Sequence, residues 1–252
     1  MGELFTEDKV MIRFVFVIVV SIPFIILLYM KSAYMDAHDE KYSEEDRYKF
    51  AKMIANTLRR NSNIRTEVYG KENLPSDGGY VMYANHQGKY DAVGIIYGHD
   101  RPCTIVMDEE RSHLPIMKPY LNVLKGSTLN KNDIKAQAQT IKKMISEIKS
   151  GRRYIMFPEG GYDHNGNNVQ EFMPGAFKCS IRSKTPIVPV ALVDSYKPFE
   201  INSLRKVTTQ VHFLKPIFYD EYKDLTTEEI ASIVKKQIVD TVKNNLRVQK
   251  VV

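Results

Sequence analysis

Short runs of β-branched and aromatic residues alternate with helical patterns from about residue 64 onward. The strand-like runs read TEVYG, GGYVMYA, CTIVM, RYIMF, PIVPVALV and QVHFLKPIF. Helical runs are expected at DAVGIIYG and at DIKAQAQTIKKMISEIKSG, where Gly151 should end the helix. The second of these helices carries one apolar stripe, which we expect to face the core: Ile134, Ile141, Ile145 and Ile148. The alternation predicts an α/β fold with a largely parallel or mixed central sheet flanked by helices.

The last helix is predicted to begin at a capping box, in which Thr226 and Glu229 satisfy each other's backbone N–H groups. Its apolar residues recur at helical spacing and are expected to point inward: Ile230, Ile233, Val234, Ile238 and Val242. The chain has 252 residues, 43% hydrophobic and 26% charged, which is enough for one α/β domain with a sizeable core. We place this domain at residues 63–252 and an N-terminal anchoring segment at residues 1–62.

An uncharged run extends from Phe14 to Met30 and is bounded by Arg13 and Lys31. As a helix it is about 25 Å long, which is marginal for a bilayer span, and including residues 10–12 lengthens it if Arg13 snorkels. Pro23 would kink the helix or turn it back as a re-entrant hairpin. A cleaved signal peptide and a buried core helix are alternatives, which the acidic start of the chain and the apolar pattern on all sides disfavour. The run predicts a membrane anchor.

The next segment, SEEDRYKFAKMIANTLRRNSN, predicts an amphipathic helix with Ser43 as its cap and an acidic first turn. Such a helix could pack on the domain, lie among lipid headgroups, or do both. Basic residues after the uncharged run outnumber those before it: Lys31, Lys41, Arg47 and Lys49 against Lys9 and Arg13. If the run spans the membrane once, the positive-inside rule places the catalytic domain on the cytoplasmic side.

The formal net charge of +6 favours anionic partners, such as nucleic acid, phosphorylated metabolites or an acidic membrane surface. No arginine-rich tract, RNP box or zinc-finger spacing supports nucleic acid as the partner. The two cysteines, Cys103 and Cys179, lie in apolar surroundings and form no CxxC or Cys/His cluster. We therefore expect no disulfide framework and no metal site.

His86 and Asp91 lie five positions apart, between the GGYVMYA strand and the DAVGIIYG helix. Ligands of α/β sheets bind beyond the carboxyl ends of the strands, where such loops gather. Five positions along a regular helix would separate the two side chains by about 140°, so they meet only if His86 precedes the helix and Asp91 begins it. Gly88 permits that bend. A carboxylate bound to one imidazole nitrogen leaves the other free to accept a proton, which predicts a general base.

Two further loops carry candidate binding residues. In YIMFPEGGYDHNGN, Pro158 should end the strand, Gly160 should let a ligand approach the backbone, and Glu159 should lie at the rim with a free carboxylate. In LKGSTLNKND, Lys131 lies in a loop just before a predicted helix, an arrangement that suits a phosphate group. A bland turn and a solvated lysine are the alternative interpretations of these two loops.

Four blocks stand in order along the chain: NHQGKYD at 85–91, GSTLNK at 126–131, FPEG at 157–160 and IVPVAL at 187–192. They resemble the NHxxxxD, Gly-rich, FPEGTRS and VPV blocks of the membrane-associated glycerolipid acyltransferases of the 1-acylglycerol-3-phosphate acyltransferase type. The resemblance covers roughly residues 64–220. It implies transfer of a fatty acyl group from an acyl thioester, either acyl-CoA or acyl carrier protein, to a lysophospholipid hydroxyl. The first acceptor to expect is 1-acylglycerol 3-phosphate, with phosphatidic acid as the product.

The resemblance also implies the roles of individual residues. His86 would be the catalytic base, Asp91 would orient its ring, and Lys131 would contact the phosphate of the acceptor. The FPEG block would bind substrate: Phe157, Pro158, Glu159 and Gly160. No bound cofactor, metal or covalent enzyme intermediate is required, which agrees with the absence of a GxSxG elbow in the sequence.

The chain departs from the family pattern at both arginines that usually bind phosphate. Gly161 and Tyr162 follow FPEG where the family has Thr and Arg, and Lys131 replaces the arginine of the Gly-rich block. A lysine binds phosphate as a point charge and lacks the bidentate fork of arginine. Lys178 or Arg182 could compensate for the missing arginines.

Other functions stay open at this stage. The acceptor could be another lysolipid or a glycerol phosphate, or the chain could be a membrane-anchored lipid-binding protein without catalysis, although the intact His86/Asp91 pair argues against the latter. A hydrolase is a further alternative, with His86, Asp91 and either His113 or Asp163 on a metal ion. No HxxxH motif supports a hydrolase, and the isolated His99-Asp100 doublet is weak evidence for one.

Overall fold

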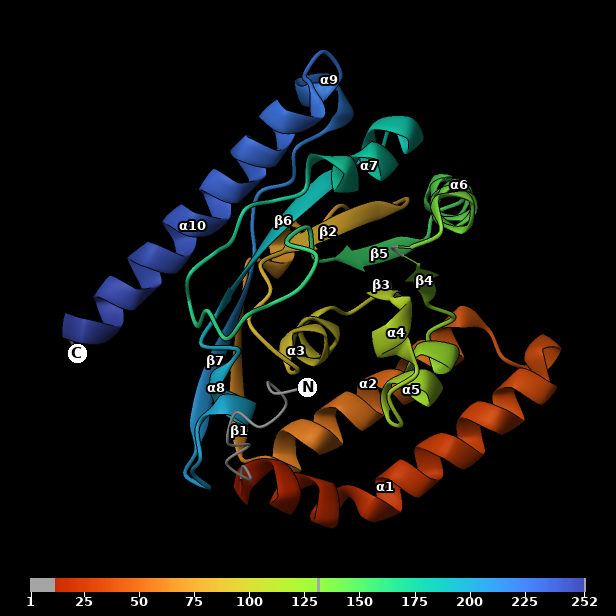
Figure 1. Ribbon diagram of the computed structural model, residues 1–252, viewed down its shortest axis with the longest axis vertical. Helices are drawn as coiled ribbons and strands as arrows, with labels where there is room; N and C mark the ends of the chain where they lie inside the picture. The colour runs from red at the N-terminus through yellow and green to blue at the C-terminus, as the bar shows by residue number, and fades with distance from the viewer. Residues whose placement is uncertain (1–11, 131, 252) are drawn as a thin grey trace, which may run out of the picture.

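Seven strands form one sheet in the order β1-β7-β6-β2-β5-β3-β4 (Figure 1). The computed structural model describes residues 12–130 and 132–251, with side chains through Arg247. The strands are β1 Ile64–Tyr69, β2 Tyr80–Ala84, β3 Thr104–Asp108, β4 Ser127–Leu129, β5 Arg153–Met156, β6 Ile187–Val193 and β7 Val207–Phe213. The α-helices are α1 Ile12–Ala37, α2 Glu44–Asn61, α3 Asp91–Gly98, α4 Glu109–Ser112, α5 Met117–Val123, α6 Ile134–Lys149, α7 Lys178–Ser183, α8 Lys197–Glu200, α9 Tyr219–Tyr222 and α10 Thr227–Val251.

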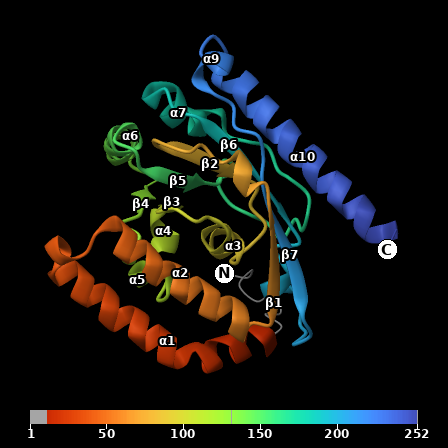
Figure 2. The same ribbon diagram turned by 180° about the vertical axis from the view of Figure 1, so that it is seen from behind.

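Neighbouring strands of the sheet pair in parallel, except that β6 and β7 are antiparallel. Helices α1, α2, α3 and α5 share one apolar cluster with the sheet, and α6, α7 and α10 share a second one. The two opposite views show these groups of helices on either side of the strands (Figures 1 and 2). This arrangement confirms the predicted α/β fold with a largely parallel or mixed sheet flanked by helices.

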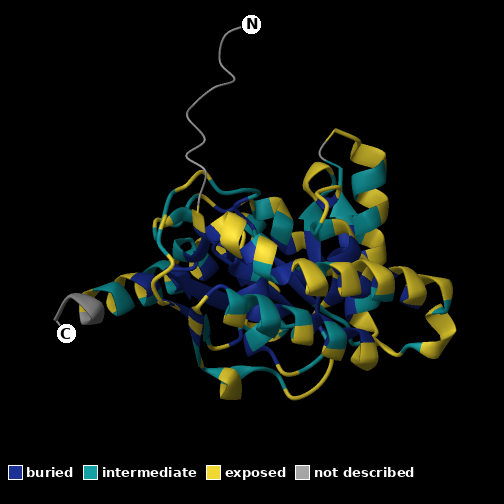
Figure 3. Ribbon diagram, turned by 90° about the horizontal axis from the view of Figure 1, so that it is seen from below, coloured by how far each residue is buried: buried dark blue, intermediate teal, exposed yellow. Residues whose placement is uncertain are grey.

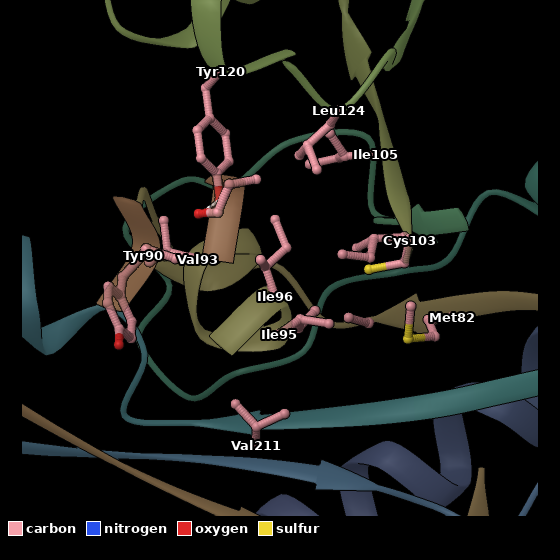
Figure 4. Close-up of a cluster of buried hydrophobic side chains, with 14 of the residues drawn as sticks. Met82, Tyr90, Val93, Ile95, Ile96, Cys103, Ile105, Tyr120, Leu124 and Val211 are labelled. Atoms are coloured by element: carbon pink, nitrogen blue, oxygen red, sulfur yellow. Dashed lines mark hydrogen bonds between the residues drawn. The ribbon is translucent and has the colours of Figure 1, made fainter. Parts of the chain in front are cut away.

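The central strands β2 and β6 are buried at every position. Buried residues gather at the middle of the molecule, and exposed residues lie along the outer helices (Figure 3). Alternate side chains of β2 enter different clusters: Met82 packs beneath α3, whereas Tyr83 packs on the opposite face. Figure 4 shows Met82 with Ile95 and Ile96 of α3. Burial on both faces explains why these strands read as nearly continuous apolar runs.

Helix α1 runs without interruption through Pro23, so the re-entrant hairpin does not form. It is long and apolar enough to cross a membrane, yet one face of it packs against α2 and α5. The buried residues recur at helical spacing along that face: Arg13, Val17, Ser21, Leu28, Ser32 and Met35. Large apolar side chains on the other face are exposed, among them Val19 at 56% and Ile26 at 53%. The helix is therefore packed on one side and apolar on its open side.

Arg13 does not snorkel. Its side chain is 1% exposed and donates to the carbonyl oxygens of Ser62, Ser203 and Arg205. These carbonyls lie next to β1 and β7, so Arg13 fixes the first turn of α1 to the sheet. Helix α2 begins at the predicted Ser43 cap and packs on the body. Helices α1 and α2 contribute to the same core as the sheet. The division into an anchoring segment at residues 1–62 and a domain at residues 63–252 stays a prediction.

The predicted helix ends are confirmed where the sequence has specific capping residues. Thr226 and Glu229 form the capping box of α10, and Gly151, with φ of 106°, follows the end of α6. The isoleucine stripe of α6 is wrong at Ile134, which is 81% exposed, because the second half of this helix is the part that packs on the sheet. Ile233 of α10 is 39% exposed rather than inward.

Two strand assignments differ from the sequence analysis. The predicted strand QVHFLKPIF begins earlier, at Val207, and ends at Phe213, after which Ile217 makes an isolated antiparallel bridge to Ile187. The Gly-rich segment, predicted as a loop, contains the short strand β4, which pairs with β3 at the edge of the sheet. Three residues are too few to show the period-two pattern of a strand.

Candidate active site

The loops that follow β6, β2, β5 and β3 meet at one edge of the sheet. These four strands are neighbours and parallel, so their carboxyl ends point the same way. His86 follows β2, Phe157 follows β5, Asp194 follows β6, and α4 follows β3. The candidate site therefore lies where ligands of open α/β sheets are expected.

His86 and Asp91 are in direct contact. The Nδ1–H of His86 donates to Oδ2 of Asp91 at 2.7 Å, with His86 in the loop and Asp91 as the first residue of α3. This is the geometry that the spacing predicted. The imidazole side chain is 17% exposed, whereas the carboxylate is fully buried. Because Asp91 holds Nδ1, the imidazole keeps Nε2 for an exchange of protons with a ligand.

Asp91 Oδ2 is also the acceptor of two backbone amides. The N–H groups of Gln87 and Gly88 donate to it at 2.5 Å and 2.9 Å. Three hydrogen bonds converge on one oxygen at the start of a helix, where a negative charge is favoured. The other oxygen, Oδ1, has no hydrogen-bond partner among the described residues. The carboxylate thus fixes both the imidazole and the backbone of its loop.

Two aromatic rings hold the His86 imidazole in place. The Phe157 ring stacks on it with centroids 4.2 Å apart and an angle of 19°. The Tyr162 ring meets it edge-on at 4.7 Å. Both rings belong to the FPEGGY segment after β5, so this segment orients the histidine. Phe157, predicted to bind substrate, therefore has a structural contact with the candidate base.

The Glu159 carboxylate is not free at the rim, and that expectation is wrong. The side chain is buried, and its two oxygens accept the backbone N–H groups of His86 at 2.9 Å and Gln170 at 3.2 Å. Burial raises the pKa of Glu159 to about 7, although the two backbone hydrogen bonds oppose this shift. Glu159 thus joins the loop after β2 to the long loop after β5.

Polar side chains that the sequence analysis left without a role complete the link to β6. The side chain of Asn85 donates to the Leu192 carbonyl at 3.0 Å and accepts its N–H at 2.7 Å, as a paired peptide group would. Gln87 accepts the N–H of Ser195 at 2.7 Å and donates to Asn167, which in turn binds Asp194. The sequence signal for this link was the presence of amide side chains, Asn85 and Gln87, just after a predicted strand.

The rest of the FPEG block is fixed by its backbone. The carbonyl oxygen of Pro158 accepts the N–H of Met173 at 2.8 Å. Gly160 has φ of 74°, a left-handed conformation that favours glycine, and an added Cβ would lie 2.5 Å from the Met173 side chain. The block is therefore a rigid turn packed against residues 170–173.

The two predicted phosphate-binding cations that the structure describes make no contact with the site. Lys131 lies outside the described residues. Lys178 and Arg182 are exposed on α7, and neither forms a hydrogen bond, ion pair or ring contact with a described residue of the site. No set of three or more His, Cys, Asp or Glu side chains among the described residues could hold a metal ion. The hydrolase alternative with His113 or Asp163 therefore lacks a ligand set in that part of the chain.

Comparison with known proteins defines the class of this chain. The model of the Acyltransferase family matches residues 65–193, which include the loops after β2, β5 and β6. The chain belongs to this acyltransferase family. It is an O-acyltransferase by its family, as the four sequence blocks predicted, and the family requires no bound cofactor.

Its relatives are enzymes of glycerolipid synthesis by name. The 1-acyl-sn-glycerol-3-phosphate acyltransferase of Borreliella burgdorferi is 27% identical over 180 residues, which cover 70% of this chain and 71% of that protein. The enzyme of the same name from Escherichia coli K12 is 25% identical over 182 residues, 70% of this chain and 74% of that protein. These matches confirm the resemblance to the 1-acylglycerol-3-phosphate acyltransferase type.

A solved structure shares the fold. The crystal structure of the 1-acyl-sn-glycerophosphate (LPA) acyltransferase PlsC from Thermotoga maritima superposes with a TM-score of 0.69 and 22% sequence identity, covering 92% of both chains. The similarity extends over most of the chain, beyond the residues that the family model matches.

Proposed function

We propose that the chain transfers a fatty acyl group from an acyl thioester to the free hydroxyl of 1-acylglycerol 3-phosphate and forms phosphatidic acid. The observation that carries this proposal is the His86–Asp91 contact at 2.7 Å, placed at the carboxyl edge of the sheet in a member of an acyltransferase family. The names of its relatives support the acceptor. The donor is acyl-CoA or acyl carrier protein, because the reaction needs a carbonyl with a good leaving group.

His86 acts as the general base in this scheme. Nε2 takes the proton of the acceptor hydroxyl as that oxygen attacks the thioester carbonyl, and Asp91 stabilises the positive charge that develops on the ring. The tetrahedral intermediate then collapses, the C–S bond breaks, and the proton on Nε2 passes to the departing thiolate. The products are the ester and the free thiol, and His86 returns to its neutral form. Backbone N–H groups of the two loops are suited to stabilise the oxyanion.

We propose that the FPEG block contributes to acceptor binding through two kinds of contact with the His86 loop. Phe157 stacks on the His86 ring, and Glu159 fixes the backbone of the His86 loop. Pro158 and Gly160 shape the turn that carries these residues. Their contribution is to place backbone groups and the imidazole against the acceptor. Lys131 is proposed to contact its phosphate as a point charge.

We propose that the protein binds the membrane through the exposed apolar face of α1. Both ends of the helix are fixed to the body, since Arg13 binds carbonyls beside the sheet and the Asn122 side chain donates to Asp36 at 3.0 Å. A bilayer cannot surround a helix held along one side, so the exposed apolar face suits a helix that lies in the plane of the interface. Acceptor lipid in that leaflet would then reach the site without leaving the membrane surface. We propose that the catalytic domain lies on the cytoplasmic side.

The deciding experiment is a panel of acceptors. Purified protein in mixed vesicles is given acyl-CoA or acyl carrier protein thioester with a series of lysophospholipids or with glycerol 3-phosphate, and the products are identified by mass spectrometry. We expect phosphatidic acid from 1-acylglycerol 3-phosphate to form fastest. A faster product from another lysolipid would refute the acceptor, and no product with any pair would refute the activity.

A further inference from the structure

Arg111 lies at the carboxyl end of β3, two strands away from His86. The strands β2, β5 and β3 are consecutive and parallel, and Arg111 belongs to the short helix α4 that directly follows β3. Neighbouring strands are about 4.8 Å apart, so the end of β3 is about 10 Å from the end of β2. The loop after β5 lies between them. Arg111 and His86 therefore face the same edge from two sides of this loop.

Tyr162 connects the two residues. Its ring lies edge-on to the His86 ring, and the guanidinium carbon of Arg111 lies 5.1 Å from the Tyr162 ring centre. The two ring distances, 5.1 Å and 4.7 Å, limit the separation of the guanidinium carbon from the imidazole centre to about 10 Å. Such a cation–π contact orients an arginine without neutralising its charge. An added Cβ at Gly161 would approach Arg111 Nη2 no closer than 4.0 Å, so the segment leaves room beside the guanidinium.

Arg111 keeps its charge available. It is exposed, and it forms no ion pair with the carboxylates of the described residues. Two lysines that follow β2 and β6 are engaged elsewhere. Lys197 pairs with Asp194 at 2.7 Å, and Lys89 lies over the ring of Phe14 on α1. A guanidinium with unused donors beside a candidate base is suited to an anionic group of the ligand.

We propose that Arg111 binds the phosphate of the acceptor and thereby selects a phosphorylated lipid. This assignment rests on the proposed function. The reacting hydroxyl oxygen and the phosphorus of such a lipid are four bonds apart, about 5 Å when extended. The phosphorus–oxygen bond and hydrogen bonds of about 2.8 Å at both ends increase the reach to roughly 12 Å, which is long enough to span a His86–Arg111 separation of at most about 10 Å. Tyr162 occupies the position at which FPEGTRS has arginine, and in this chain the tyrosine ring contacts an arginine of the helix that follows β3.

The test compares two acceptors that differ by the phosphate. Arg111→Gln, Arg111→Lys and wild type are assayed with 1-acylglycerol 3-phosphate and with the monoacylglycerol of the same acyl chain. Loss of a charge-assisted pair should raise KM for the phosphorylated acceptor by roughly 10- to 100-fold, with a smaller change in kcat and no change for monoacylglycerol. Arg111→Lys should restore part of the loss. Arg65→Gln is the matched control, because Arg65 is an exposed arginine on β1 at the far edge of the sheet.

A second pair of variants tests the role of Tyr162. Tyr162→Phe keeps the ring face and should leave KM near the wild-type value, whereas Tyr162→Leu should raise it several-fold. Wild type that prefers the phosphorylated acceptor, with an unchanged KM in Arg111→Gln, would overturn the assignment and leave the proposed function standing. Wild type that acylates both acceptors equally would overturn the proposed acceptor and this assignment with it. Melting curves confirm that each variant is folded.

Discussion

The His86–Asp91 pair makes the sharpest prediction. His86→Ala removes the candidate base, and the single-turnover rate of acyl transfer should fall by about 10² to 10⁴, the usual contribution of a positioned base. Asp91→Asn should fall in the same range. An asparagine oxygen in place of Oδ2 could still accept the three hydrogen bonds made there, but it would not balance the charge that forms on the ring.

The stability changes expected for the two variants follow from their contacts. His86→Ala loses the stacked contact with Phe157, about 0.5–1.5 kcal/mol, and the hydrogen bond to the Asp91 carboxylate, about 1.5–3 kcal/mol. In Asp91→Asn the amide nitrogen would occupy the position of Oδ1, which has no hydrogen-bond partner among the described residues. A buried donor without an acceptor costs about 1–3 kcal/mol, so Asp91→Asn should be destabilised by an amount comparable to His86→Ala. Neither cost explains a hundredfold loss of rate in the folded fraction.

The assay combines denaturant unfolding with single-turnover acyl transfer on the same preparations. His212→Ala is the matched control, because its ring stacks on Tyr69 at 4.6 Å in the outer strands β7 and β1. We expect a similar loss of stability from His212→Ala and a normal rate. If the His86 and Asp91 variants were well folded and reacted at near wild-type rates, the pair would be a structural cap and the catalytic assignment would be refuted.

Three further predictions concern pH, the membrane and the phosphate. The pKa of Glu159 rises from 4.5 to about 7 on folding, so its ionisation should lower the free energy of unfolding as pH rises across that interval. At about 1.4 kcal/mol per pKa unit, the free energy of unfolding of Glu159→Gln should rise relative to that of wild type by up to about 3 kcal/mol between those pH values. A difference in urea titrations that does not depend on pH would contradict this. Val19→Glu combined with Ile26→Glu should weaken vesicle binding at least tenfold without changing the melting temperature, since each apolar side chain buried in the membrane contributes about 1.5–3 kcal/mol. Equal binding of this variant and wild type in a flotation assay would refute the membrane face. The paired alanine substitutions are the control. Lys131→Ala should raise KM for the acceptor more than it lowers kcat, and unchanged kinetics would remove Lys131 from the phosphate site.

Much of the fold could be predicted because the informative segments have regular patterns. The strands β2 and β6 read as apolar runs, and the caps at Ser43 and Thr226 were specific enough to fix helix starts. Strand order and the antiparallel pairing of β6 with β7 depend on contacts between distant segments, which local periodicity does not encode. The same reason explains why the burial of Arg13 was not predicted. A flanking arginine is expected to extend to water, and two of the three carbonyls that Arg13 binds belong to residues 190 and 192 positions away.

The candidate site was partly predictable from the chemistry of one loop. His86 and Asp91 are close in sequence, so spacing and the strand-to-helix joint were enough to bring them together. Glu159 was predicted with the wrong environment because its partners, the N–H groups of His86 and Gln170, lie on separate loops. Arg111 had no local motif. Its signal was its position just after a strand, which became meaningful once the sheet order placed β3 beside β5.

The partners of the His86 loop also set a sequence of events in time. Glu159 is 73 residues downstream of His86, and Leu192 is 107 residues downstream of Asn85. At about 5–20 residues per second, a ribosome takes roughly 5–20 s to make the stretch that joins Asn85 to its partner. The apolar face of α1 is made before any of these residues. We expect a growing chain to reach the membrane while it is still inert, and chains arrested before residue 190 should bind vesicles without transferring acyl groups. The order that we expect is attachment before activity, with catalysis beginning at the lipid surface.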